Sequence, residues 1–463
     1  MKSKTSASPN SNAWLTAMAF VLIGYFAGPG HLQAQATTAP TSSPALAATP
    51  DPKNAQATTP AGFWGQDTLT GDWGGLRKKL EDDGFAVNPT YTSIIQGNPS
   101  GGKSQGFAND GLFNVQLDFD LEKMTDGDVT GLTVHANALY IYGPSLSQEY
   151  VGDFSGTNLI YAYNTVRLQE LWLEKWFLDK RLSLKVGNMA VDTEYFQSSS
   201  DALFINSTFT LATLMANNVP NSPTYPVASP GVRLKFLPTP ETYVMTGVYG
   251  MDNSSNQATT NKYGTRFALT ASSGMFIMSE AGYLLNQQPN DKGLQGTYRL
   301  GSWVHTADYD TWGSQADNAL GTGPLKSGGS NYGVYGLVDQ QVYSHDAQSI
   351  SLFAWGGGAP SNINFVDWYF QGGVDFTGFI PGRDNDVAGV AFARSDVSGN
   401  YSASQVLQGN PPSTAESVLE ATYKVQVAPW WSVQPDLQYY FNPSGVQGSS
   451  NAVVLGISTN ISF

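Results

Sequence analysis

Charged and tryptophan side chains in this 463-residue chain occur at every second position of segments that are otherwise apolar. In residues 169–177, Glu170, Trp172 and Glu174 alternate with leucines. Carboxylates and amines can exchange hydrogen bonds with a polar solute, and flat aromatic rings can cover its apolar C–H faces. The same side chains can also cross-link strands or hydrate a wall, and the spacing leaves these roles open.

When this two-residue alternation is followed along the whole chain, eleven residues fall on the same, polar side of their segments. They are Glu170, Trp172, Glu174, Lys185, Arg233, Lys235, Glu280, Arg299, Trp303, Glu420 and Asp436. The strongest candidates are Arg233 and Lys235 in GVRLKF, with Glu170 and Glu174 in QELWLEK, because they place charge most densely between apolar neighbours. We predict that all eleven side chains face a polar interior.

Patterns that would indicate catalysis or cofactor binding do not fit their context. Residues 97–104, GNPSGGKS, match the phosphate-binding pattern G-x-x-x-x-G-K-[ST], but a period-two stretch follows where that loop requires a helix. His135, His305 and His345 lack the close spacing of metal ligands, and no G-x-S-x-G motif occurs. We expect a Gly-rich hairpin loop at 97–104, and no metal, cofactor or enzymatic activity.

The composition separates this chain from ordinary soluble proteins. Charged residues make up 13% and aromatic residues 12%, with 49 glycines and no cysteine, whereas average proteins carry about 25% charged residues. The formal net charge of −14 disfavours nucleic acid as a partner. The only long apolar run lies at the extreme N-terminus, which excludes a bundle of membrane-spanning helices, and disulfides are excluded too.

The first 62 residues read as an export leader and a linker. Lys2 and Lys4 precede an apolar stretch, and Ala34-Gln35-Ala36 offers a cleavage site, so residues 1–36 are predicted to be a cleaved secretory signal peptide. Residues 37–62 are dominated by Ala, Thr, Pro and Ser, which predicts a disordered linker.

One short helical segment is predicted in residues 63–84. Leu76 and Leu80 lie four residues apart on one face, Asp72 could cap the helix, and Gly84 could end it. It is the only convincing helix that the pattern indicates after the leader.

From Phe85 onward the chain reads as strands separated by turn residues. In residues 453–463, for example, Leu455 and Ile457 share one face while Gly456 and Ser458 share the other. Such alternation is typical of a half-buried soluble sheet, or of a transmembrane barrel that meets lipid outside and water inside.

Three features favour the barrel. Aromatic residues gather at strand ends such as 140–142 and 439–441, as interfacial girdles require. Short turns such as 124–129 and 381–386 alternate with long loops such as 195–230. A membrane β-protein must close to satisfy its backbone, and residues 85–463 supply about 16 strands at about 24 residues each. We therefore predict an all-β fold, a transmembrane antiparallel β-barrel of about 16 strands.

The loop at 195–230 contains the stretch FINSTFTLATLM (204–215), which is too uncharged for a free external loop. It could fold inward as a constriction, form a lipid-facing strand, or pack against other loops.

Several long phrases of the chain resemble the OprB-type carbohydrate-selective porins of Gram-negative outer membranes, in the same order. They are GDWGGLRKKLEDDGF (71–85), GLTVHANALYIYGPSLSQEYVGD (131–153), LQELWLEKWFLDKRLSLKVGNMAVDTEYF (168–196), YPVASPGVRLKF (225–236), NYGVYGLVDQQVY (331–343), GFIPGRDNDVAGVAFARS (378–395) and ESVLEATYKVQVAPWWSVQPDLQYYFNP (416–443). The resemblance covers nearly all of residues 63–463.

The resemblance implies a 16-stranded barrel with a short periplasmic N-terminal helix, in which inward loops narrow a lumen of charged and aromatic side chains. It implies passive diffusion of monosaccharides, glucose-type carbohydrates, with a modest preference, and ion permeation. The implied partners are small sugars, outer-membrane lipid, and the barrel-assembly machinery, which would read the C-terminal strand ending in Phe463. The chain departs from the pattern in its long linker and in the lack of a dense arginine cluster.

Other functions are compatible with part of the pattern. The main alternative is a porin for other small solutes, organic acids or aromatics, with no sugar preference. An outer-membrane hydrolase and a secreted sugar-binding sandwich are less consistent with the scattered histidines and with the strand pattern. The acidic composition further predicts that cations pass more easily than anions.

Overall fold

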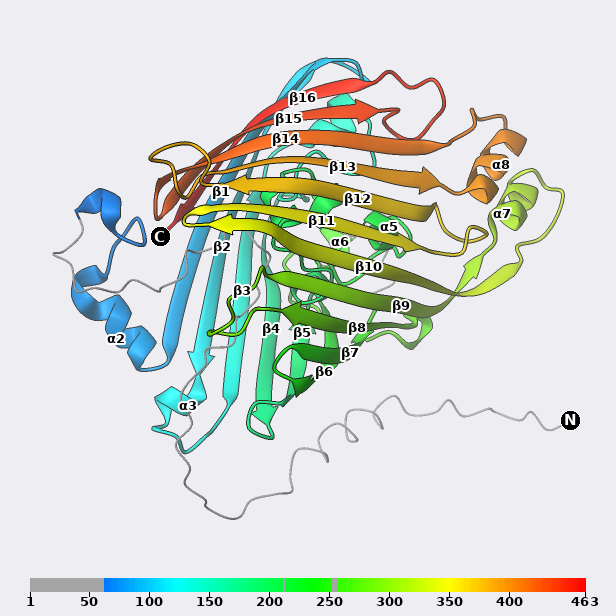
Figure 1. Ribbon diagram of the computed structural model, residues 1–463. Helices are drawn as coiled ribbons and strands as arrows, with labels where there is room; N and C mark the ends of the chain where they lie inside the picture. Colours follow the sequence, from blue (N-terminus) through cyan, green and yellow to red (C-terminus); the bar gives the residue numbers. More distant parts are fainter. Residues whose placement is uncertain (1–61, 211–212, 252–256, 268) are drawn as a thin grey trace, which may run out of the picture. The chain divides into compact units, whose positions relative to one another are not determined.

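The computed structural model describes residues 62–210, 213–251, 257–267 and 269–463, so the predicted signal peptide and all but residue 62 of the predicted linker lie outside the described residues. Within these residues, sixteen strands form one closed barrel in which every strand is antiparallel to its neighbours. The closure is made by β1 and β16, which pair with Ile95 opposite Ile457. The predicted fold class is confirmed (Figure 1).

The strands follow one another around the wall in chain order. Their bounds are β1 (Phe85–Ser100), β2 (Gly106–Asp120), β3 (Leu132–Tyr142), β4 (Thr165–Phe177), β5 (Leu182–Met189), β6 (Ser229–Thr239), β7 (Thr242–Gly250), β8 (Met275–Leu285), β9 (Gly296–Asp310), β10 (Ser327–His345), β11 (Gln348–Gly358), β12 (Val366–Thr377), β13 (Val387–Val397), β14 (Ala415–Ala428), β15 (Trp431–Phe441) and β16 (Ala452–Ser462).

The two faces of the wall differ in chemistry because successive strand residues point to opposite sides. In β14, Leu419 is 41% exposed on the outside, whereas its neighbour Glu420 is fully buried on the inside. In β16, Leu455 and Ile457 are exposed while Val454 is buried. The apolar residues that would be the core of a soluble sheet therefore form the outer surface, as a lipid-facing barrel requires.

The connections differ in length between the two ends of the barrel. The end that carries the C-terminus has short connections such as 178–181 and 346–347, and we call it the turn end. The opposite end carries long connections such as 143–164, 190–228 and 398–414, and we call it the loop end. Residues 97–104 run from the end of β1 into its hairpin with β2, and no helix follows Ser104, so the phosphate-loop pattern is a hairpin.

More helical segments occur in the described residues than the sequence indicated. They are η1 (Phe63–Gly65), η2 (Trp73–Gly75), α2 (Leu76–Asp82), α3 (Leu121–Met124), η3 (Ser147–Val151), η4 (Val191–Thr193), η5 (Asp201–Leu203), α4 (Ser207–Thr210), α5 (Thr213–Ala216), α6 (Gln257–Thr260), η6 (Ala271–Ser273), α7 (Trp312–Ala319) and α8 (Gly399–Leu407). The helices α7 and α8, which begin after the side-chain caps Thr311 and Ser398, were missed because both are short and polar. No helix in the described part of the chain is long and apolar enough to cross a membrane.

The segment before β1 lies against the turn end. The helix α2 ends before Gly84, whose φ of +93° suits glycine, and the amide of Lys78 donates to the Asp72 carboxylate at 3.1 Å. The indole of Trp64 stacks on that of Trp430 with ring centroids 5.9 Å apart. These contacts join the start of the described chain to its last strands.

Candidate functional site

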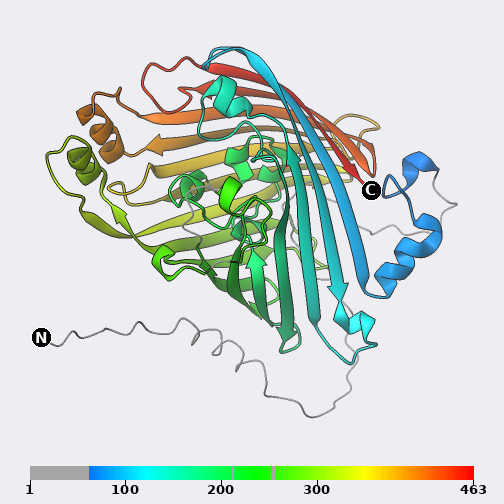
Figure 2. The same cartoon turned by 180° about the vertical axis from the view of Figure 1, so that it is seen from behind.

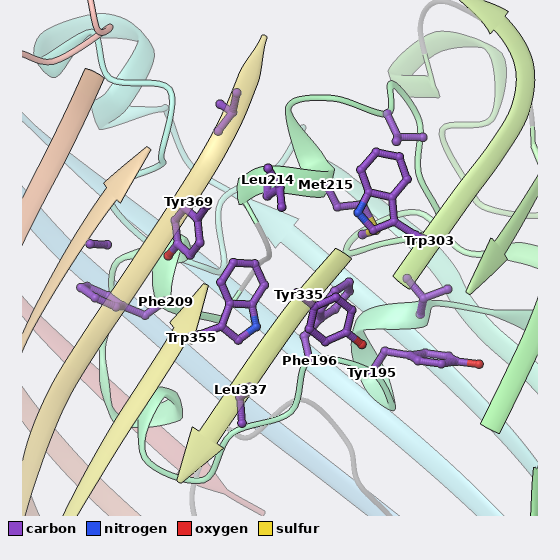
Figure 3. Close-up of a cluster of buried hydrophobic side chains, with 14 of the residues drawn as sticks. Tyr195, Phe196, Phe209, Leu214, Met215, Trp303, Tyr335, Leu337, Trp355 and Tyr369 are labelled. Atoms are coloured by element: carbon purple, nitrogen blue, oxygen red, sulfur yellow. The ribbon is translucent and has the colours of Figure 1, made fainter. Parts of the chain in front are cut away.

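The connection between β5 and β6, residues 190–228, folds into the barrel. Its side chains Phe209 and Met215 are buried, and they share one cluster with the wall aromatics Trp355 and Tyr369 (Figure 3). Both backbone views show this green segment inside the barrel, enclosed by the strands of the wall (Figure 1 and Figure 2). Burial of apolar surface contributes about 25 cal/mol per Å², which explains why an uncharged loop turns inward. Of the three placements open to residues 204–215, the described residues 204–210 and 213–215 adopt the inward one.

Carboxylates of the wall hold the backbone of this inward loop. Glu420 of β14 accepts hydrogen bonds from the amides of Ile205 at 2.6 Å and Asn206 at 2.9 Å. Glu280 of β8 accepts one from the amide of Phe196 at 3.1 Å. Buried backbone amides need an acceptor, so these side chains position the loop.

Two further wall carboxylates accept hydrogen bonds from loop backbone. Glu170 of β4 accepts a hydrogen bond from the amide of Ala190 at 2.9 Å. Glu416 of β14 accepts from the amides of Phe154 at 3.1 Å and Ser155 at 2.9 Å, in the connection between β3 and β4. The wall thus fixes both loops that enter the barrel.

An ionic cluster joins β4, β5 and β6 to the inward loop. Arg233 donates to Glu194 from Nε at 2.9 Å and to Glu174 from Nη2 at 2.9 Å, and Lys185 lies 3.1 Å from Glu194. Although burial opposes its ionisation, Lys185 and Arg233 hold the pKa of the Glu194 carboxyl below its usual range. The loop carboxylate therefore pairs with two wall cations.

Aromatic rings lie against two of the wall cations. The Lys185 ammonium lies 3.9 Å from the ring centroid of Trp172, and the ring of His135 stacks on Trp172 at 4.7 Å. Lys235 lies 5.0 Å from the ring centroid of Tyr243. Such contacts stabilise cations that have little access to water.

All eleven residues singled out in the sequence have side chains on the inner side of the wall, buried or half-buried. Glu174, Lys185 and Arg233 meet in the ionic cluster, and Glu280 pairs with Arg299 at 3.4 Å. The others are spread around the barrel, so no single site unites the set. They are Glu170, Trp172 and Lys235 near the ionic cluster, Trp303 among the buried aromatics, and Glu420 and Asp436 on β14 and β15.

Sequence reasoning missed several residues of the interior. Glu194 lies in a loop, where the period of two does not apply. Gln169 is buried together with its neighbour Glu170, because a bulge in β4 turns two successive residues inward. The low charge of the loop at 195–230 was the one signal that pointed to interior loop residues.

A cavity of about 180 Å³ lies between the wall at β2–β4 and the two inward loops. Its lining is dominated by amides, hydroxyls and aromatic rings rather than by the charged residues of the strands. The lining residues are Leu112, Asn114, Leu139, Gly156, Asn158, Leu159, Ile160, Tyr161, Gln169, Asp192, Thr193, Phe196, Gln197, Ser198, Asp201, Ala202, Ser207, Thr210 and Tyr225.

The only charged groups among the described lining residues are two loop carboxyls. Burial raises the pKa of Asp192 to about 7. The hydrogen bond that its carboxylate accepts from the amide of Tyr225 acts in the opposite direction and lowers the pKa. Burial, with a contribution from the charge of Asp339, raises the pKa of Asp201 well above its usual value. At neutral pH these two carboxyls therefore carry less negative charge than free carboxyls would.

No group of three or more His, Asp or Glu side chains among the described residues could hold a metal ion. His135 lies 2.7 Å from Asp118, and the His305 ring bonds the Tyr309 hydroxyl and the Ser273 carbonyl, so both rings have local partners.

Comparisons with known proteins agree with this geometry. The family described as carbohydrate-selective porin, OprB family, matches residues 104–463. Porin B of Pseudomonas aeruginosa is 29% identical over 441 residues, which cover 88% of this chain and 93% of that protein.

Solved structures show the same fold. The high-pH structure of Pseudomonas putida OprB is 25% identical and has a TM-score of 0.79, covering 87% of this chain and all of that one. The low-pH structure of the same protein has a TM-score of 0.56 at 21% identity and covers 86% of this chain and 99% of that one. The fold and the family indicate an outer-membrane channel rather than an enzyme. This chain belongs to the OprB family of carbohydrate-selective porins.

Proposed function

We propose that this porin lets monosaccharides of the glucose type diffuse passively through the cavity of about 180 Å³ beside the inward loop. The observation that carries the proposal is the lining. Asn114 and Gln169 offer amides that both donate and accept hydrogen bonds, while Tyr161 and Phe196 offer rings for the C–H face of a sugar. A selective pore must replace part of the solute's hydration without holding it tightly.

The eleven wall residues have two roles in this proposal. Glu170, Glu280 and Glu420 hold loop backbone and so set the width of the path. The remaining eight line or support the water-filled part of the lumen and contact the sugar only where a loop leaves them accessible.

The test is reconstitution in planar bilayers, with glucose titrated against the ion current. We expect conductance steps that glucose reduces in a saturable way, and a higher half-blocking concentration for Tyr161→Ala. Tyr332→Ala is the matched control, because Tyr332 is 54% exposed on the outer face of β10. Conductance that no sugar affects would overturn the sugar preference, and folded protein without conductance would overturn the pore.

Porin activity toward other solutes is the alternative. Because the described cavity lining holds no Lys or Arg, it offers no cationic group that would attract organic anions. We infer that cations, and neutral solutes such as sugars, pass more easily than anions. An anion-selective reversal potential in a salt gradient, or block by succinate or benzoate but not by glucose, would favour the alternative.

We also propose that residues 1–36 direct export and are cleaved, that the outer face meets outer-membrane lipid, and that the last strand engages the barrel-assembly machinery. The ring of Phe463 lies 5.8 Å from that of Phe113, at the edge of the apolar outer face. N-terminal sequencing of the outer-membrane form tests the cleavage. Loss of outer-membrane insertion on Phe463→Ala, seen as loss of the heat-dependent gel shift, tests the assembly signal.

A further inference from the structure

A second cavity, of about 520 Å³, lies at the loop end and shares no lining residue with the first. Three segments build it: the tail of the inward loop, the end of β9 with α7, and the connection between β11 and β12. Its lining residues are Asn217, Asn218, Pro220, Asp308, Tyr309, Asp310, Trp312, Gln315, Asn318, Ala319, Leu325, Ile363 and Phe365.

The cavity contains an indole in a fixed orientation. The Nε1 of Trp312 donates to the carbonyl of Asn364 at 2.8 Å, and the edge of the Tyr401 ring packs on the indole at 4.9 Å. Tyr401 is held in turn by an edge contact with Phe365 at 4.8 Å. Trp312 nevertheless remains half-exposed toward the cavity. A rigid ring loses little conformational entropy when a ligand covers it.

Polar groups that the fold does not use surround this ring. Some lining side chains have partners: Asp308 accepts from Ser327 at 2.9 Å, and Asn218 bonds the backbone of Val366. No hydrogen bond or ion pair joins the carboxylate of Asp310 to the part of the chain that the structure describes, and the same is true of the side-chain amide of Asn318. Both are available to a ligand.

We propose that this cavity is a second carbohydrate site at the mouth of the barrel, which binds a pyranose before it enters the path. The carboxylate of Asp310 would accept hydrogen bonds from two neighbouring hydroxyls, and the Asn318 amide would donate and accept. The Trp312 indole would cover a C–H face of the ring. The chemistry differs from a cation site, because no group of three or more Asp, Glu or His side chains in the described residues is placed to hold a metal ion.

This inference rests on the proposed sugar path, and the test keeps the two apart. Glucose is added to the loop-end side of oriented porin in planar bilayers, and its half-blocking concentration is measured for wild type, Trp312→Ala and Asp310→Asn. We expect both variants to raise that concentration about fivefold, the equivalent of one lost aromatic or charged contact.

Two controls and one milder variant accompany the test. Trp368→Ala removes an indole that is 65% exposed on the outer face of β12, and Asp346→Asn changes an exposed carboxylate at the turn end, so both should behave as wild type. Trp312→Phe keeps a ring in place and should have a smaller effect than Trp312→Ala. The heat-dependent gel shift checks that each variant is folded.

The outcomes separate the two proposals. If glucose blocks wild type and both Trp312→Ala and Asp310→Asn equally, the second site is refuted while the sugar path stands. If glucose blocks none of the proteins, the sugar path fails and the second site fails with it. If calcium rather than glucose changes the current in a way that Asp310→Asn abolishes, the cavity is a cation site and the proposal is overturned.

Discussion

The amide of Asn206 donates a hydrogen bond of 2.9 Å to the carboxylate of Glu420, which lies 214 positions later in the chain. This contact, with its neighbour from Ile205, holds the tip of the inward loop against the opposite strand β14. In the proposed function, the width of the solute path therefore depends on Glu420, because this wall residue anchors the loop.

Glu420→Ala should widen the path. A hydrogen bond contributes about 0.5–1.5 kcal/mol and Glu420 accepts two from the loop tip, so the tip loses much of its attachment when this side chain is removed. We expect a higher single-channel conductance and weaker block by glucose, with a smaller change in Glu420→Gln, which keeps one acceptor. Asp346→Asn serves as the control, since Asp346 is exposed at the turn end. Wild-type conductance in folded Glu420→Ala would show that other contacts hold the loop.

Arg233→Ala should destabilise the barrel strongly. Arg233 is 1% exposed and neutralises Glu194 and Glu174, so its removal leaves two buried carboxylates with less compensation. Loss of one partner from a buried pair costs about 3–5 kcal/mol. The temperature at which the gel shift is lost should fall, and it should recover partly in Arg233→Ala/Glu194→Gln. A double variant no more stable than the single one would contradict this coupling.

The inward loop should lose stability as the pH rises. Burial raises the pKa of Asp192 from 3.8 to about 7, so the folded loop favours the protonated form. The stabilisation that Asp192 gives to the folded state is complete below about pH 4 and is lost as the pH rises through about 7. We expect a lower unfolding temperature at pH 8 than at pH 5, and a smaller difference for Asp192→Asn. An unchanged difference would exclude Asp192 as the titrating group.

The N-terminal segment should stabilise the closure of the barrel. Arg77 donates from Nη2 to the carbonyl of Phe463 at 2.7 Å, and the amide of Leu69 donates to the carbonyl of Ser462 at 2.8 Å. We expect Arg77→Ala to lower the unfolding temperature modestly, by the equivalent of about 1 kcal/mol. Lys78→Ala is the matched control, because Lys78 is exposed and pairs only with Asp82 of the same helix. Equal stability of the two variants would argue against a role in closure.

The sequence by itself determined the barrel and the inner face of its wall. Alternation is a local property, because each strand residue points to the side opposite its neighbour. Leu419 and Glu420 could therefore be assigned to opposite faces without knowledge of any contact. The tight turn between β4 and β5 and the end of α2 at Gly84 are equally local.

Only the tertiary structure decided where the loops go and which groups face a solute. Residues 204–215 were compatible with three placements, and the inward one depends on Glu420 and on wall aromatics far away in the chain. Glu194 joins Arg233 only because the loop returns over β6. Both cavities are formed by segments from separate parts of the chain. The free energy that places such segments comes from burial and charge pairing between residues far apart in the sequence. These interactions leave no periodic pattern in the local sequence.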